Sequence, residues 1–108
     1  MLDYPPFEKI ISFRIQSKKM DQAQEVAKKL AFRCYSLKEQ NAKYEEMEIL
    51  GPAESPIFKI RGDFRYQLLI KSKNKSLINQ FVRQVLHNEK WIPSVVRVIT
   101  DVDPQSLL

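Results

Sequence analysis

Basic and aromatic side chains alternate closely between positions 58 and 66, and they are the residues with the clearest chemical potential. They are Phe58, Lys59, Arg61, Phe64, Arg65 and Tyr66. Lysine and arginine neutralise phosphate groups, while aromatic faces can stack on unpaired bases. The pattern predicts a surface that binds nucleic acid, with a merely solvated face as the alternative interpretation. Tyr66 is expected in the core because it alternates in phase with Leu68 and Ile70, whereas Phe58 and Phe64 are expected to be freer.

The positive charge of the chain is concentrated in the same region. The 108 residues carry a formal net charge of +5. Between positions 51 and 75, six basic residues stand against two acidic ones, because Lys71, Lys73 and Lys75 follow the segment described above. Such a clustered excess is typical of proteins that bind a polyanion. The candidate nucleic-acid-binding residues are therefore Lys59, Arg61, Arg65, Lys71, Phe58 and Phe64.

Catalysis needs a constellation of reactive groups, and the sequence offers none. A phosphate-cradling Gly-x-x-x-x-Gly-Lys-Ser/Thr loop is missing, and the chain has only two glycines. Cys34 falls on an apolar helix stripe, so a catalytic pair with His87 is disfavoured. Asp101 and Asp103 could suit a cation, but acidic residues that end a strand before proline favour a structural role. We therefore expect no catalytic residue, metal site or cofactor in this chain.

Apolar periodicity predicts six elements. Alternation predicts strands at 10–16 and 65–71, and spacings of three and four predict helices at 20–40 and 77–86. Shorter strands are expected at 45–50 and 95–100. Residues 52–64 contain two prolines and a Gly-Asp pair, which predicts a long functional loop. The order of elements predicts an α+β fold, the ferredoxin-like split βαβ arrangement (βαββαβ), with a four-stranded sheet and two helices on one face.

Finer details of these elements also follow from the pattern. Met20 and Cys34 belong to the apolar stripe of the first helix, and Asp21 with Gln24 would form its capping box. Ser72 or Asn74 could cap the second helix. The polar face of the sheet is expected to carry Arg14, Arg65, Gln67 and Lys71. Leu69 shares that face and indicates that part of it could dock another domain.

Residues 51–69 closely resemble a motif of a known family. The motif reads Gly-Pro-Ala-x-x-Pro, followed by Lys-x-Arg-Gly-x-x-Arg-Tyr-Gln-Leu-Leu, and positions 51–56 and 59–69 match it. Tyr4-Pro5-Pro6-Phe7 is similar to the segment that leaves the family's helicase core, and Asp101-Val102-Asp103-Pro104 is similar to its closing motif. Over residues 4–108 the chain thus resembles the C-terminal domain of PriA, the bacterial primosomal replication-restart helicase family also called primosomal protein N′.

The resemblance implies a role at DNA. Members of the family recognise abandoned replication forks, unwind DNA in the 3′-to-5′ direction with ATP, and start reloading of the replicative helicase. Their C-terminal domain is ferredoxin-like and helps to bind DNA. Lys59, Arg61 and Arg65 match the family's basic positions, and Lys75 stands near where the acidic tail of single-stranded-DNA-binding protein docks. ATP and zinc are expected only in the full-length protein, since the motor motifs and zinc-binding cysteines are absent from this chain.

The resemblance also suggests an organisation: a linker from the helicase core at 1–8, the domain at 9–104 and a tail at 105–108. With no signal-peptide pattern and no long apolar run, we expect a cytoplasmic protein without membrane contact. The expected partners are forked or single-stranded DNA, single-stranded-DNA-binding protein and the remaining PriA helicase domains. The alternative is a structural domain that braces the helicase lobes and docks proteins, with little DNA affinity of its own.

Overall fold

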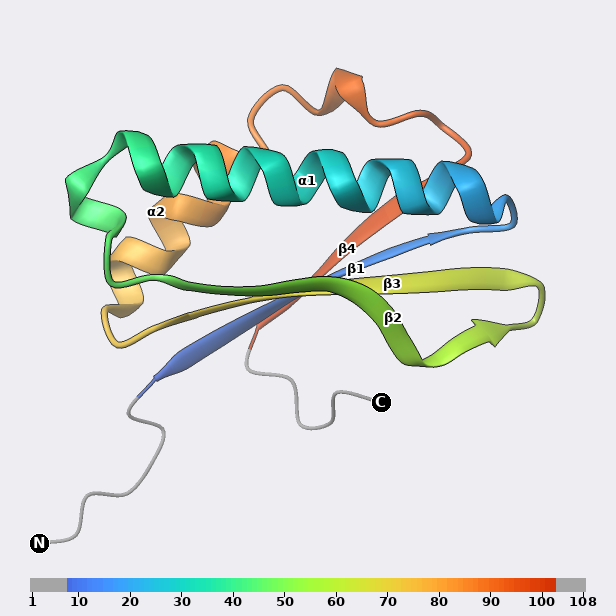
Figure 1. Cartoon of the computed structure of the whole chain (residues 1–108), viewed down its shortest axis with the longest axis horizontal. Coiled ribbons are helices and arrows are strands. Elements are labelled where there is room, and N and C mark those ends of the chain that lie inside the picture. Colours follow the sequence, from blue (N-terminus) through green and yellow to red (C-terminus); the bar gives the residue numbers. More distant parts are fainter. Residues whose placement is uncertain (1–7, 103–108) are drawn as a thin grey trace, which may run out of the picture.

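The computed structural model describes residues 8–102, in which the elements follow one another in the predicted order (Figure 1). They are β1 (Lys9–Ser17), α1 (Met20–Gln40), β2 (Glu48–Ile60), β3 (Asp63–Ser72), α2 (Lys75–Val85) and β4 (Arg97–Val102), with the 3₁₀ helices η1 (Ala42–Tyr44) and η2 (Glu89–Trp91). The strands pair in the order β2-β3-β1-β4, and every pair is antiparallel. This is the ferredoxin-like topology, so the predicted fold class is confirmed.

The core lies between the sheet and the two helices, which cover the same face of the sheet (Figure 1). Alternate residues of each central strand point into it, as Phe13 of β1 and Leu68 of β3 do. Leu30 of α1 and Phe81 of α2 meet them from the other side, and all four side chains are fully buried. Burying such side chains contributes roughly 1.5–3 kcal/mol each. The buried stripe of α1 and the sheet therefore fix each other's position.

The helix boundaries agree with the sequence pattern, but their caps agree only in part. Asn74 caps α2 as predicted, because its Oδ1 accepts a hydrogen bond of 2.9 Å from the Leu77 amide. The predicted capping box of α1 is wrong, because Lys19 is the N-cap and makes no side-chain cap hydrogen bond. Met20 is also not a core residue, since it is 46% exposed at the first position of the helix. Cys34, about four turns further on, is buried as predicted.

The predicted long loop at 52–64 is wrong, because most of it forms the second half of β2. This strand runs for 13 residues and joins β3 through a tight hairpin. It lies at the edge of the sheet. A proline on an edge strand is tolerated where the missing backbone N–H would have pointed to solvent and not to a neighbouring strand, which accommodates Pro52 and Pro56. Two register shifts interrupt its pairing with β3. The last strand also differs slightly from the prediction, beginning at Arg97 and ending at Val102.

The opposite face of the sheet is not covered by any helix within residues 8–102. Register pairs Arg14 of β1 with Gln67 of β3, so the predicted polar face exists, and Leu69 lies in the next row of the same face. Leu50 of β2 pairs with Leu69 and is 44% exposed. This open face is therefore mixed, with polar rows around an apolar centre. None of the helices described is long and apolar enough to cross a membrane.

Candidate nucleic-acid interface

The hairpin between β2 and β3 presents Arg61 at its tip. Ile60 pairs with Asp63, so Arg61 and Gly62 are the two residues of the turn. Both have positive φ angles, 51° for Arg61 and 84° for Gly62. Two-residue hairpin turns with positive φ at both positions favour asparagine or aspartate followed by glycine. An arginine at the first position is a conformationally costly choice, and its side chain is exposed.

A row of polar side chains crosses the open face beside this hairpin. The register pairs Gln16 of β1 with Arg65 of β3 on one side and with Arg97 of β4 on the other. Arg97 is exposed, whereas Arg65 is half-buried and its Nε has no hydrogen-bond partner within the described residues. Arg14, one row further in, donates from Nε to Gln16 Oε1 at 3.1 Å and lies 3.9 Å from the Asp101 carboxylate. Three arginines thus line this half of the face.

The turn between β1 and α1 adds two more cations at the same end. Lys18 and Lys19 are exposed, and Lys19 is the N-cap of α1. The N-terminus of a helix carries a partial positive charge, which adds to that of the side chains. Together with Gln16 and Arg97, both lysines line a cavity of about 380 Å³, whose single carboxylate belongs to Asp63.

The topology brings the end of β1, the hairpin, the start of β4 and the start of α1 to one end of the sheet (at the right in Figure 1). The cations at this end lie on both faces, because Lys59 pairs with Phe64 on the helix-covered face whereas Arg65 and Arg97 lie on the open face. We call this group the hairpin-end cluster. Its members are Lys18, Lys19, Lys59, Arg61, Arg65 and Arg97.

The aromatic residues beside the cluster mostly pack on one another. Phe58 is half-buried against the core, with its ring centroid 5.5 Å from that of Phe64 and 5.3 Å from that of Tyr66. The Lys59 Nζ lies 4.9 Å from the Phe64 ring centroid. Burial raises the pKa of the Tyr66 phenol, and the Glu54 carboxylate raises it further. Tyr66 is a core residue, as predicted, but Phe58 and Phe64 are less free than the sequence suggests.

The structure separates the remaining predicted residues from the cluster. Lys71, Lys73 and Lys75 lie at or beyond the far end of β3, which runs away from the hairpin. Lys71 forms an ion pair of 3.4 Å with Glu8 and stands opposite Glu48 of β2. Lys75 is exposed at the first position of α2. The run of positive charge seen in the sequence therefore divides between two ends of the molecule.

Sequence reasoning missed Lys18, Lys19 and Arg97. They stand far from residues 58–66 in the chain, and no local pattern connects them with that segment. The predicted βαββαβ order contained the signal, because antiparallel pairing places the end of the first strand beside the start of the third and fourth. Combining the expected topology with the charge pattern would have found all three.

The residues considered for catalysis or cation binding, Cys34, His87 and Asp101, have structural surroundings. Cys34 is buried, and burial raises the pKa of its thiol to about 12, although the positive charge of Arg33 partly offsets this. His87 is exposed, and its backbone carbonyl accepts a hydrogen bond of 3.1 Å from Arg33 Nη2. Asp101 is ion-paired with Arg14, while Asp103 lies outside the described residues. Within residues 8–102 no three His, Cys, Asp or Glu side chains are grouped so that they could hold a metal ion.

Comparison with solved structures gives the class of the fold first. The chain is similar to the de novo designed protein LFR1 1, described as having a ferredoxin fold, with a TM-score of 0.59 and 11% identity over 91% of this chain and 86% of that one. It is also similar to the de novo designed protein Foldit4, with a TM-score of 0.58 and 16% identity over 92% and 99% of the two chains. The molecule is a ferredoxin-like α+β domain with a basic end.

Sequence comparison then identifies the family. Residues 1–105 match the family described as the primosomal protein N C-terminal domain, and the chain belongs to this family. It is 33% identical over 109 residues to the replication restart protein PriA of Borreliella burgdorferi, covering 99% of this chain and 15% of that protein. It is 32% identical over 110 residues to that of Synechocystis, covering 99% and 12% respectively. The resemblance inferred from residues 51–69 is confirmed, and the chain corresponds to a small part of each relative.

Proposed function

We propose that this domain binds the phosphate backbone of DNA at stalled or abandoned replication forks through the hairpin-end cluster. Its relatives carry the name replication restart protein. The proposal takes forked and single-stranded DNA as the ligands. In this proposal the domain is a binding module. ATP-driven unwinding, with any zinc site, belongs to the remainder of a full-length protein in the cytoplasm.

The observation that carries the proposal is that six cations from three separate segments lie at one end of the sheet, where Asp63 is the one carboxylate that lines the cavity. Each phosphate contacted by lysine or arginine releases condensed counterions, so such a cluster gives affinity that falls with salt. The exposed position of Arg61 supports the same role. Functional sites often retain residues in backbone conformations that the residue disfavours.

The proposed recognition is of shape and charge rather than base sequence. Both helices pack their apolar stripes on the sheet. Neither projects from the domain as a recognition helix that could enter the major groove of DNA. Contacts to phosphates position a protein on DNA but carry no sequence information. Phe58 and Phe64 are packed against each other, which leaves stacking on a base as a minor contribution.

Fluorescence anisotropy with labelled single-stranded, duplex and forked DNA across a salt series tests this proposal. Replacing Arg61 or Arg65 by alanine should weaken binding by about three- to tenfold each and reduce the slope of affinity against salt. Lys73→Ala is the matched control, because Lys73 is exposed and lies beyond the far end of β3. If the folded domain fails to bind any of these DNAs at low salt, the proposal is wrong.

A second candidate function is docking, and the open face favours it. Leu50 and Leu69 pair across β2 and β3 on this face, which gives it an apolar centre suited to another domain of a longer protein. Lys75, exposed at the start of α2, is proposed to receive the acidic tail of single-stranded-DNA-binding protein. A docking role alone predicts little affinity for DNA at any salt concentration, so the same titration separates the two functions.

A further inference from the structure

The two edges of the sheet differ in how well they are protected from pairing with a further strand. β2, at one edge, contains Pro52 and Pro56 and has two register shifts, and both features hinder such pairing. β4, at the other edge, contains no proline, and its register with β1 is unbroken. Within residues 8–102 no strand pairs with the outer side of β4. This edge can therefore accept one more strand.

The residues of β4 suit pairing with another strand. The residues on the open face, whose partners in β1 point away from the helices, are Arg97, Ile99 and Asp101. On the helix-covered face Val98 is partly buried, whereas Thr100 is exposed and Val102 is 53% exposed. β-Branched side chains favour strands in which they pack against a neighbour. An exposed edge of this composition is expected to have a partner.

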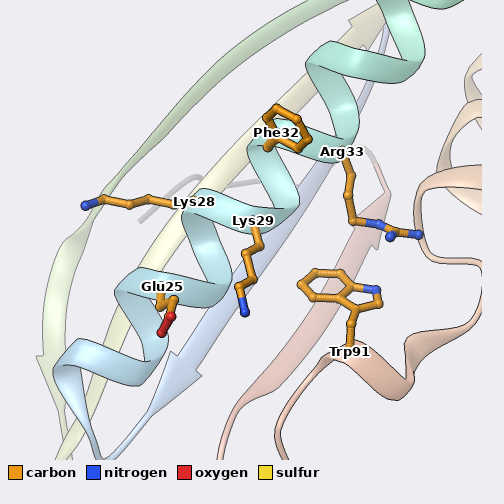
Figure 2. Close-up of a pocket in the computed structure, with 6 residues that line it drawn as sticks. All are labelled: Glu25, Lys28, Lys29, Phe32, Arg33 and Trp91. Carbon is orange, nitrogen blue, oxygen red and sulfur yellow. The ribbon is translucent and has the colours of Figure 1, made fainter.

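The helix layer leaves the second half of this edge accessible. η2 precedes β4 in the chain, and its Trp91 is turned to α1, where the guanidinium carbon of Arg33 lies 5.0 Å from the ring centroid (Figure 2). Arg33 is fixed in turn, because its Nε donates to the Val85 carbonyl at 2.9 Å and its Nη2 donates to the His87 carbonyl at 3.1 Å. These contacts hold η2 on α1, and Thr100 of β4 stays exposed.

β4 is complementary in charge to a second β4 that runs antiparallel to it. Residues opposite each other in an antiparallel pair point to the same side of the sheet. When Ile99 lies opposite Ile99 of a second copy, Arg97 lies opposite Asp101, and two-fold symmetry repeats this pair. Both ion pairs then lie on the open face. Shifting the register by one residue removes both, because Arg97 would then face Thr100 or Val102.

The two charged residues are free to take part in such pairs. The Asp101 carboxylate lies 3.9 Å from Nη1 of Arg14, and the Asp101 side chain is 46% exposed, so this contact within the chain is weak. Arg97 is exposed and forms no ion pair within residues 8–102. In the paired arrangement, the Asp101 carboxylate lies between Arg14 of its own chain and Arg97 of the second copy.

We propose that the outer edge of β4 pairs with β4 of a second copy of this chain, antiparallel about a two-fold axis through Ile99. The two four-stranded sheets then join into one, with the helices of both copies on the same side. Only Arg97 to Asp101 of each copy pair directly, so the interface is small and the expected Kd is about 10–100 µM. The inference does not rest on the proposed function. Because Arg97 also belongs to the hairpin-end cluster, its test contains no DNA.

Sedimentation equilibrium of the 108-residue chain, between about 5 and 500 µM, tests the proposal. Arg97→Glu and Asp101→Lys should each weaken self-association about tenfold, because symmetry makes both cross-strand pairs like-charged. An equimolar mixture of the two variants should associate within about threefold of the parent, because the new glutamate of one faces the new lysine of the other. Misfolding cannot produce this recovery. Lys73→Glu is the matched charge control, exposed beyond the far end of β3, and should change the affinity by less than about twofold.

A disulfide tests the register. Because Ile99 lies on the two-fold axis, Ile99→Cys brings two thiols opposite each other, with Cα atoms about 4.5–5.5 Å apart and within reach of a disulfide. Thr100→Cys places its two Cα atoms more than about 7 Å apart, which is too far. The native Cys34 is buried and should not compete. Mild oxidation should therefore crosslink only the Ile99→Cys chain on a non-reducing gel.

Two results would overturn the proposal. A parent chain that stays monomeric up to the highest concentration would leave the β4 edge to an extended segment of a different protein. Equal crosslinking of Ile99→Cys and Thr100→Cys would show association without the register centred on Ile99.

Discussion

At the scale of single residues, Cys34 shows how packing determines chemical character. The thiol lies in the buried stripe of α1 with no exposed surface. Burial removes water from the thiolate and raises the pKa from 9.0 to about 12, and the nearby Arg33 guanidinium only partly reverses this. A protonated thiol is a small apolar group and a poor nucleophile. The assignment of Cys34 to the core, made from helical spacing alone, is therefore confirmed.

Stability at alkaline pH should depend on this residue. The pKa of the thiol is higher in the folded chain than in the unfolded one, so its contribution is complete below pH 9 and is lost as the pH rises toward 12. Replacing Cys34 by alanine should cost about 1–2 kcal/mol of unfolding free energy at pH 7, through a small cavity. Between pH 9 and pH 10 that cost should shrink by about 1 kcal/mol. Urea denaturation of both proteins at each pH measures it, and a cost independent of pH would contradict the assignment.

At the scale of elements, apolar periodicity predicts the strands and helices correctly wherever one face of the segment is buried. The alternation around Phe13 and Leu68 and the stripe through Leu30 survive in the structure because burial imposes the period. The second half of β2 was predicted as a loop because this edge strand has no continuous buried face that would impose such a period. It is largely exposed along residues 50–60, apart from Ser55 and Phe58, so its composition is governed by solvent and not by the core.

In the β2–β3 hairpin, Arg61 should favour DNA binding at a cost in stability. Asparagine adopts positive φ at lower cost than arginine does. Arg61→Asn should therefore raise the unfolding free energy by up to about 1 kcal/mol while weakening DNA binding. Thermal unfolding and anisotropy on the same variant measure both effects. A variant that is less stable than the parent would mean that the Arg61 side chain supports the turn instead of straining it.

At the scale of the whole molecule, the charge is divided between two ends of one sheet. The hairpin end carries cations from three segments, whereas Lys71 at the far end is paired with Glu8 and stands opposite Glu48. A net charge of +5 conceals this asymmetry. The family assignment and the fold came from local motifs and periodicity. The cluster did not, because Lys18 and Arg97 are brought to Arg61 only by the antiparallel pairing of strands distant in sequence.

The measurement that tests the central claim most directly is a titration of ¹⁵N-labelled protein with single-stranded DNA, followed by the chemical shifts of the backbone amides. Shifts should concentrate at the hairpin end, around Gln16, Lys18, Lys19, Arg61 and Arg97, and should weaken as salt is added. The amides from Lys71 to Lys75 should remain nearly unchanged. Shifts centred on the start of α2, or no shifts at low salt, would contradict the claim that the hairpin end binds DNA.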